Sequence, residues 1–364
     1  MSTGWIYHER YMWHDTGAAG GMMPPGRWLQ PDRHLEHADT KRRLQNLLDV
    51  SGLLDELERI VPGPATEEQL LRLHAPEYVA RIRDLSTAGG GDAGDAETRV
   101  GPGSFEIACL AAGGVIAAVD AVLGGRIENA YALVRPPGHH ALADRPMGFC
   151  LFAKVAVAAL HARAAHGLER IAVVDWDVHH GNGTEAAFRE DRAVLTISLH
   201  QDGLFPPGSG PLEERGAGPG EGFNLNVPLP PGSGIGAYVG AFERVVMPAL
   251  SAFAPDLVLI ASGYDASAFD PLGRMMLSSD EYRTMTRAVM NVANATCHGR
   301  VVVAHEGGYS PFYVPFCGLA VVETLAGRRT EVVDPYAEGI AATAGQQLTA
   351  EQDEAIARAE ALLH

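Results

Sequence analysis

The segment IAVVDWDVHHGNGT, residues 171–184, decides the fold prediction, because an apolar run in it ends in acids, histidines and glycines. Its first five residues, 171–175, lack polar alternation, which predicts a strand buried on both faces. Side chains at i and i+2 of an extended chain share a face, so Asp175, Asp177 and His179 are expected to point the same way. Asp-x-His supplies two of the three protein ligands that an open zinc site needs. The alternative is a salt-bridged, capped turn without a ligand.

Composition describes an acidic, soluble globular chain. It has 364 residues, of which 46% are hydrophobic, and its formal net charge is −17. The length is ample for a sizeable core. The excess of carboxylates argues against nucleic acid as a partner, and it would attract a cationic ligand.

The cysteines and the N-terminus indicate the compartment. The four cysteines have no CxxC spacing and are few for a secreted scaffold, so we expect free thiols at Cys109, Cys150, Cys297 and Cys317. The start, MSTGWIYHERYMWHD, carries charge where a signal peptide needs an apolar core, and no window reaches about 18 uninterrupted apolar residues. We therefore expect a cytoplasmic protein with no membrane partner.

Apolar runs alternate with helical patterns along the chain. Besides a short apolar start, Trp5 to Tyr7, strands are predicted at Tyr131 to Val134, Val194 to Leu199, Leu257 to Ser262 and Val301 to Ala304. This alternation is typical of an α/β fold with a parallel sheet covered on both faces. No repeat or Ser/Pro linker divides the chain, so we predict one domain over residues 1–364.

Other segments predict helices and loops. Leucine spacing predicts a helix from Asp39 to Ile60, and Thr66 with Gln69 forms a capping box that starts another. The Ala/Gly-rich run 105–123 predicts a helix that packs tightly on a sheet. Residues 11–37 and the glycine-rich acidic segment 87–103 are expected to be loops, and the second lacks the GK[ST] of a phosphate loop.

Residues that can do chemistry follow the predicted strands. Ligands of open parallel sheets bind beyond the carboxyl ends of the strands. The residues expected there are His139 and His140 in RPPGHH, Asp177 and His179 in DVHH, Asp265 in GYDAS and Tyr309 in HEGGYS. Each alone is more often a packed loop side chain. Because they follow strands of one sheet, we expect them to converge.

The donors among these residues predict a metal centre. Asp177, His179 and Asp265 suit Zn²⁺ with one position left open, although Fe²⁺ and Co²⁺ take similar ligands. Zinc lowers the pKa of a water to about 7, and a histidine of the adjacent pair has a pKa that suits a general base. Tyr309 would donate to the developing oxyanion. The predicted reaction is metal-assisted hydrolysis of an amide.

The motifs RPPGHH, GFC, DWDVHHGNGT, ISLH, GYDAS and EGGYS occur in this order, and together they resemble the zinc-dependent histone deacetylase family from about Trp5 to Asp334. The stretches HADTKRR and NVPLPPGSG are similar to bacterial histone deacetylase-like amidohydrolases related to class II deacetylases. The resemblance implies the arginase/deacetylase fold, with a mainly parallel eight-stranded sheet flanked by helices on both faces.

The resemblance also implies catalytic roles. The predicted ligands match the zinc ligands of the family, and Tyr309 matches the residue that polarises the carbonyl. His140 matches the general base and later acid, and His139 matches an electrostatic partner. Asp175 matches the carboxylate bonded to His139, and Asn182 matches the residue supporting His140, which is Asn in class II enzymes and Asp in class I enzymes. A neutral Asn raises the imidazole pKa less than a carboxylate would.

Further matches imply a substrate tunnel and two structural sites for K⁺ or Na⁺. Phe149 and Phe205 match the aromatic walls around an acyl-lysine stem, although two core phenylalanines are the alternative; the other expected substrate contacts are Gly148, Leu272 and Gly307. The inner cation site matches Asp175, Asp177, His179, Ser198 and Leu199. The outer site, mainly through carbonyls, matches Phe188, Asp191, Val194 and Phe223.

Two departures from related patterns matter. Arginase-like enzymes bind two metals through D-x-H-x-D and D-x-D, but Gly181 and Ser267 stand at the matching positions here, so one metal is expected. After GFCLF the family usually has two polar residues, and this chain has Ala153 and Lys154. That change is expected to loosen the loop that holds Phe149, and thus to affect substrate fit, unless it is compensated elsewhere.

The predicted function is removal of acetyl or other short acyl groups from lysine side chains of proteins or peptides. The alternative is deacetylation of polyamines or other small amines, whose specific enzymes often place an acid at the tunnel mouth, where Leu272 stands here. A catalytically silent binding module conflicts with the presence of every catalytic residue. The apolar segment with Met22, Met23 and Trp28 predicts contacts at the tunnel rim or between subunits, and we expect a homo-oligomer, dimer or tetramer.

Overall fold

The central sheet of the computed structural model, which describes residues 2–363, has eight strands, and all its strand pairs are parallel. The order across the sheet is β10-β9-β8-β11-β12-β7-β1-β4. In chain order the strands are β1 Thr3–Tyr7, β4 Glu58–Ile60, β7 Asn129–Leu133, β8 Ile171–Asp175, β9 Val194–Gln201, β10 Asn224–Leu229, β11 Leu257–Ser262 and β12 Val301–His305.

The strands are apolar because both sheet faces are covered. In β8, Ala172 and Val174 pack into one hydrophobic core, whereas Ile171 and Val173 pack into the other. Every residue of β8, β11 and β12 is buried. A strand between two cores needs no polar alternation, and the predicted parallel sheet with helices on both faces is confirmed.

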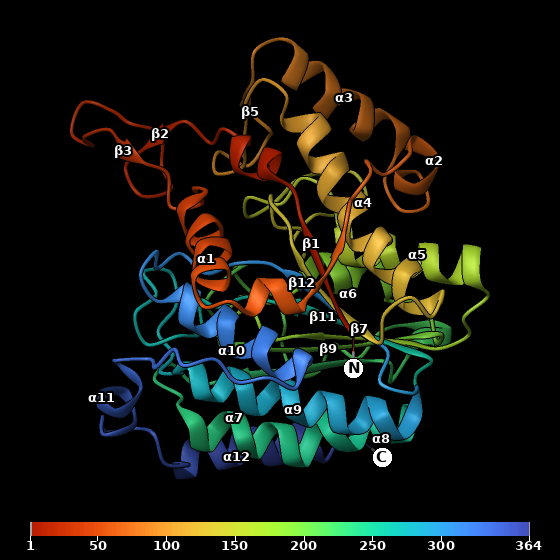
Figure 1. Ribbon diagram of the computed structural model, residues 1–364, viewed down its shortest axis with the longest axis vertical. Coiled ribbons are helices and arrows are strands. Elements are labelled where there is room, and N and C mark those ends of the chain that lie inside the picture. The colour runs from red at the N-terminus through yellow and green to blue at the C-terminus, as the bar shows by residue number, and fades with distance from the viewer. Residues whose placement is uncertain (1, 364) are drawn as a thin grey trace.

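Helices form a layer on each side of the sheet, and Figure 1 shows α4 and α5 on one side and α7, α9 and α12 on the other. The first side carries α2 Glu67–Leu70, α3 Pro76–Thr87, α4 Ser104–Leu123, α5 Lys154–His166 and α6 Asn182–Phe188. The second carries α1 Asp39–Val50, α7 Ile235–Ala241, α8 Met247–Phe253, α9 Ser279–Thr296, α10 Val314–Ala326, α11 Ala337–Ala341 and α12 Ala350–Glu360.

Helix α4 is the apolar helix predicted from its small residues. It is long and apolar enough to cross a membrane, but 78% of its apolar window is buried inside the protein. Gly113 and Gly114 let it approach its neighbours, because a Cβ at Gly113 would lie 1.9 Å from the carbonyl oxygen of Gly63. Its composition therefore serves close packing in the core.

The predicted helix from Asp39 to Ile60 is wrong in its second half. Helix α1 ends at Val50, and Gly52 turns the chain with a φ of +76°, which glycine adopts at low cost. A short 3₁₀ helix, Leu53–Glu56, follows, and the chain then enters the edge strand β4 beside β1. The leucine spacing did not indicate that the helix ends at Val50, because Leu53 and Leu57, which follow the break, are also buried.

Strand β10 is not among the strands predicted from the apolar runs, and the other elements agree with the pattern with small differences. The capping box at Thr66 and Gln69 is confirmed by both of its hydrogen bonds. The two predicted loops contain short hairpins, formed by β2 Ala18–Ala19 with β3 Asp32–Arg33 and by β5 Gly91–Asp92 with β6 Arg99–Val100. The four cysteines are free and buried, as predicted.

Candidate active site

Four neighbouring strands bring the predicted site residues together. The order β8-β11-β12-β7 places the loops after these strands side by side at one edge of the sheet. These loops carry Asp177 and His179, then Asp265, then Tyr309, and finally His139 and His140. Convergence thus follows from strand order, since parallel strands end at the same edge.

The predicted ligands form a compact, buried donor set. Nδ1 of His179 lies 2.9 Å from Oδ1 of Asp177 and 3.2 Å from Oδ2 of Asp265. One ligand atom from each residue lies within 4.8 Å of the others. Donors that each lie about 2.0–2.2 Å from one tetrahedral zinc ion would have separations close to those between the ligand atoms of these three residues. Oδ2 of Asp265 is buried without a hydrogen-bond donor among residues 2–363, so the residues fit a bound cation.

The local charges also favour a cation between these side chains. Burial opposes protonation of His179, but its hydrogen bond to Asp177 and the nearby Asp265 carboxylate raise its pKa to about 10. Burial, together with the Asp177 carboxylate, raises the pKa of Asp265 to about 6. Two buried carboxylates facing one imidazole need a compensating positive charge, which a divalent ion would supply.

Backbone groups hold the two carboxylates in place. The N–H of Gly307 donates to Oδ2 of Asp177 at 2.9 Å, and the N–H of Val178 donates to Oδ1 of Asp265 at 2.8 Å. A Cβ at Gly307 would lie 2.3 Å from Oδ2 of Asp265, so the close approach requires glycine. Gly307, predicted as a substrate contact, thus contacts the carboxylates of the predicted metal ligands and is not among the residues that line the cavity described below.

The two adjacent histidines have opposite electrostatic environments. Nδ1 of His139 lies 2.9 Å from Oδ2 of Asp175, and Nδ1 of His140 lies 2.7 Å from Oδ1 of Asn182. Burial lowers the pKa of His139, but Asp177 and Asp175 outweigh it and raise the value to about 9. Burial and then the neighbouring His139 keep the pKa of His140 well below its usual range. The surroundings therefore favour the cationic form of His139 and the neutral form of His140.

A cavity of about 160 Å³ leads to these groups. Its lining residues come from several loops: Met22, Glu97, His140, Gly148, Phe149, His179, Leu204, Phe205, Leu272 and Tyr309. Four of the five predicted substrate contacts are among them. The ring centroids of Phe149 and Tyr309 are 5.8 Å apart, and those of His140 and Phe205 are 5.0 Å apart. A larger surface hollow of about 590 Å³, lined by Arg170 and Phe253 among others, lies away from the catalytic loops.

The acidic loop, which the sequence pattern left without a role, supports the tunnel wall. Oδ2 of Asp95 accepts the N–H of Gly148 at 3.1 Å, and Oγ1 of Thr98 accepts the N–H of Phe149 at 2.9 Å. Phe149 has a φ of +68°, a conformation that aromatic residues rarely adopt, so these bonds hold it against strain. The only signal in the sequence was the density of acids and glycines.

Asp270 is a second support that the sequence did not reveal. Its Oδ2 accepts the N–H of Tyr309 at 2.6 Å, and its Oδ1 accepts the N–H of Leu272 at 2.9 Å. One buried carboxylate thus links the backbone of Tyr309 to that of Leu272. The bond to Leu272 is a local contact two residues along the chain, but the bond to Tyr309 joins separate loops, and no spacing in the sequence indicates it.

The residues expected at the cation sites are also near one another. Asp175 and Ser198 are register partners in β8 and β9. At the outer site, the carbonyl of Asp191 accepts the N–H of Val194, and the carbonyl of Phe223 accepts the N–H of Thr196. These carbonyls each keep a second lone pair, and the assignment to K⁺ or Na⁺ stays a prediction.

Steric crowding around Gly181 bears on the number of metal ions that the site can hold. A Cβ at Gly181 would lie 2.3 Å from Oδ2 of Asp175. A metal-bridging carboxylate at this position would therefore require the site to rearrange, which favours a single ion.

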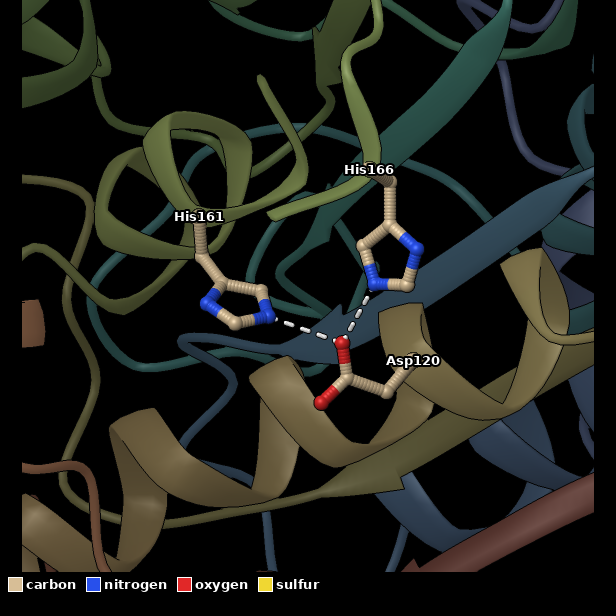
Figure 2. Close-up of side chains that lie close together, drawn as sticks. All are labelled: Asp120, His161 and His166. Atoms are coloured by element: carbon tan, nitrogen blue, oxygen red, sulfur yellow. Dashed lines mark hydrogen bonds and ion pairs between the residues drawn. The ribbon is translucent and has the colours of Figure 1, made fainter. Parts of the chain in front are cut away.

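A second group of potential ligands lies between α4 and α5. Figure 2 shows His161 and His166 directing Nε2 at the same carboxylate oxygen of Asp120, at 2.8 and 2.7 Å. Nη1 of Arg72 lies 3.2 Å from Nδ1 of His161 and can only donate. His161 therefore carries its proton on Nε2 and donates to Asp120, so in this arrangement the group is a hydrogen-bonded link.

Comparisons with known proteins agree with this geometry. Residues 34–325 match the family model described as a histone deacetylase domain. The chain is 54% identical over 341 residues to a histone deacetylase-like amidohydrolase of Pseudomonas aeruginosa, with 93% of this chain and 90% of that protein covered. It is 38% identical over 331 residues to a probable deacetylase of Archaeoglobus fulgidus, with 90% and 87% covered. The solved HDA15 HD domain is similar at a TM-score of 0.87 and 32% identity, covering 100% of this chain and 94% of that one.

Proposed function

Because the chain belongs to the histone deacetylase family and has the arginase/deacetylase fold, we propose that it is a zinc-dependent amidohydrolase that removes acetyl or other short acyl groups from lysine side chains of proteins or peptides. The observation that carries this proposal is the aromatic-walled cavity that leads to His140, Tyr309 and the ligand His179. A narrow apolar channel suits a (CH₂)₄ stem, and burial contributes about 25 cal/mol per Å².

Residues Asp177, His179 and Asp265 would hold the metal. A divalent ion there supplies a Lewis acid that polarises the amide carbonyl and lowers the pKa of a water. His140, neutral at pH 7 and bonded through Nδ1 to Asn182, has Nε2 free to take the proton of the attacking water. It then returns that proton to the leaving amine.

The other residues stabilise charge as the amide carbon becomes tetrahedral. The Tyr309 hydroxyl donates to the carbonyl oxygen as negative charge develops on it. Burial, followed by the Asp265 and Asp177 carboxylates, raises the pKa of Tyr309 well above its usual value, so the phenol keeps its proton. His139, held cationic by Asp177 and Asp175, adds positive potential beside the reacting atoms.

A second substrate class is favoured by one observation. Glu97 from the acidic loop lines the same cavity as Leu272, so the tunnel does have an acid near it. A carboxylate there would attract the distant ammonium of an acetylated polyamine, although it would also attract a basic peptide.

Side-by-side kinetics with zinc-loaded protein separate these substrates. We expect kcat/KM for an acetyl-lysine or trifluoroacetyl-lysine peptide to exceed that for N-acetylputrescine and acetylspermidine. A large preference for the polyamines would replace acyl-lysine by small amines as the substrate, whereas no turnover of any acyl amine would contradict the hydrolase function itself.

We also propose a homo-oligomer built with the N-terminal loop. Trp28 is 87% exposed and Trp13 69% exposed, with Met23 half exposed nearby in sequence. Met22 of the same loop lines the tunnel, so a subunit contact here would act on the rim. Light scattering at micromolar concentration should show a dimer or tetramer, and Trp28→Ser should reduce the mass; a wild-type monomer would refute the proposal.

A further inference from the structure

The chain uses arginine for nearly all its basic side chains. It contains only two lysines, Lys41 and Lys154, among 28 Lys plus Arg residues. Both lysine side chains are 1% exposed. Lys154 stands where the family usually has a polar residue after GFCLF, and it is the first residue of α5.

That position is unfavourable for a cation. The N-terminus of a helix carries partial positive charge, so a lysine there is repelled by the helix dipole. Removal from water adds a desolvation cost that only a nearby opposite charge offsets. The preceding residue, Ala153, provides no side-chain cap, and its N–H donates instead to Nε2 of His74 at 3.0 Å. Local helix stability therefore does not explain why a lysine is buried here.

The partner of Lys154 is a carboxylate between two catalytic loops. Nζ of Lys154 lies 2.6 Å from Oε2 of Glu306, whose side chain is fully buried. The approach does not meet hydrogen-bond geometry, so charge attraction pairs the two groups. The same oxygen, Oε2, accepts the N–H of Gly138 at 2.6 Å.

Each end of this contact leads directly to catalytic residues. Gly138 immediately precedes His139 and His140, and Glu306 immediately precedes Gly307, whose N–H holds the Asp177 carboxylate. The stem of Lys154 also packs against Gly138, because a Cβ on that glycine would lie 2.9 Å from Cγ of the lysine. Lys154 thus contacts the loop that carries the two histidines. It also pairs with the carboxylate of Glu306, which reaches from the loop of Tyr309 to that histidine loop.

We propose that Lys154 is a positioning residue for the deacylation reaction, acting through Glu306 to hold the backbone of the two catalytic histidines relative to the loop of Tyr309. The inference rests on the proposed function for its kinetic consequence. It also accounts for the departure from the family pattern, since the buried ion pair replaces the polar residues expected after GFCLF.

The first test is Lys154→Met, which keeps the apolar stem and removes the ammonium. We expect kcat to fall about tenfold to a hundredfold, because small displacements of catalytic groups have effects of that size. KM should change less than threefold and bound zinc should not change. A variant with wild-type kcat that has only lost thermal stability would show a purely structural ion pair and overturn the proposal.

Two neutral double variants keep the test informative if the single variant does not fold. Lys154→Met with Glu306→Gln retains an oxygen that can accept the Gly138 N–H, whereas Lys154→Met with Glu306→Ala has no acceptor. Neither leaves a buried unpaired charge. We expect the Gln variant to retain at least ten times the kcat of the Ala variant, and equal values would contradict a role in positioning.

Hydrogen exchange provides a readout that does not depend on activity. Pro136 and Pro137 have no amide hydrogen, so Gly138 is the first exchangeable amide after Arg135 in peptides that span RPPGHH. Its exchange should be slow in the wild type and the Gln variant and faster in Lys154→Met and the Ala variant. Unchanged protection would overturn the inference, whereas an inactive wild-type protein with the expected exchange pattern would contradict only the proposed function.

Discussion

Nδ1 of His140 lies 2.7 Å from Oδ1 of Asn182, so the imidazole donates to a neutral amide and keeps Nε2 free toward the cavity. His139 in the same pair donates to the charged Asp175. One imidazole is thus oriented by a dipole and the other by a full negative charge, which separates their pKa values.

Exchanging Asn182 for aspartate should shift the pH dependence. Catalysis by the general base requires neutral His140, so kcat/KM rises as pH passes the pKa of this group. A carboxylate at position 182 favours the imidazolium and raises that pKa, so the acidic limb of Asn182→Asp should move to higher pH. A pH profile of kcat/KM checks this, and an unmoved limb would contradict His140 as the base.

Tyr309→Phe should separate chemistry from metal binding. Tyr309 is not among the three ligand residues, but its ring lines the cavity beside Phe149. Removal of one donor to the oxyanion costs about two to three orders of magnitude in kcat. We expect that loss with an unchanged zinc content. Near-normal kcat would refute the role of Tyr309 in stabilising the oxyanion.

Gly148→Ala tests the fit between the tunnel wall and the base. Gly148 has a φ of +53°, and an added Cβ would lie 2.5 Å from Cδ2 of His140. We expect kcat/KM to fall at least tenfold. The matched control is Gly125→Ala, where φ is +70° but no atom lies within 4 Å of an added Cβ. Both variants should lose about 1–2 kcal/mol of stability from the left-handed backbone conformation, but the control should retain activity.

Some of this site could be predicted from the sequence, and some could not. Asp177, His179, Asp265 and the histidine pair were predictable because each follows an apolar strand, and parallel strands end at one edge. Glu306, whose carboxylate bonds to Gly138, and Asp270, which bonds to Tyr309, act through backbone amides of other loops. No periodicity encodes such pairings, because the contact depends on how separate loops fold over the sheet.

Glu97→Gln should measure the effect of the tunnel acid on substrate choice. Burial, followed by the Asp95 carboxylate, raises the pKa of Glu97, so part of its attraction for cations depends on pH. Loss of the charge should raise KM several-fold for acetylspermidine and change KM less for a neutral acetyl-lysine peptide. Glu68→Gln, on the exposed surface of α2, is the charge-matched control. Equal effects on both substrates would exclude Glu97 as a selector between them.

Removal of zinc should destabilise the folded protein as well as abolish hydrolysis. Without a cation, Asp177 and Asp265 face each other in a buried site, and ligand binding to the native state stabilises by about 4 kcal/mol when the free metal is a thousandfold above Kd. Chelation should therefore lower Tm, and one equivalent of Zn²⁺ should restore both Tm and turnover. Asp265→Asn should weaken zinc binding, whereas His166→Ala should leave one zinc per chain, because the Asp120 group is a hydrogen-bonded link. A stoichiometry that falls on replacing His166 would show instead that the link between α4 and α5 binds metal.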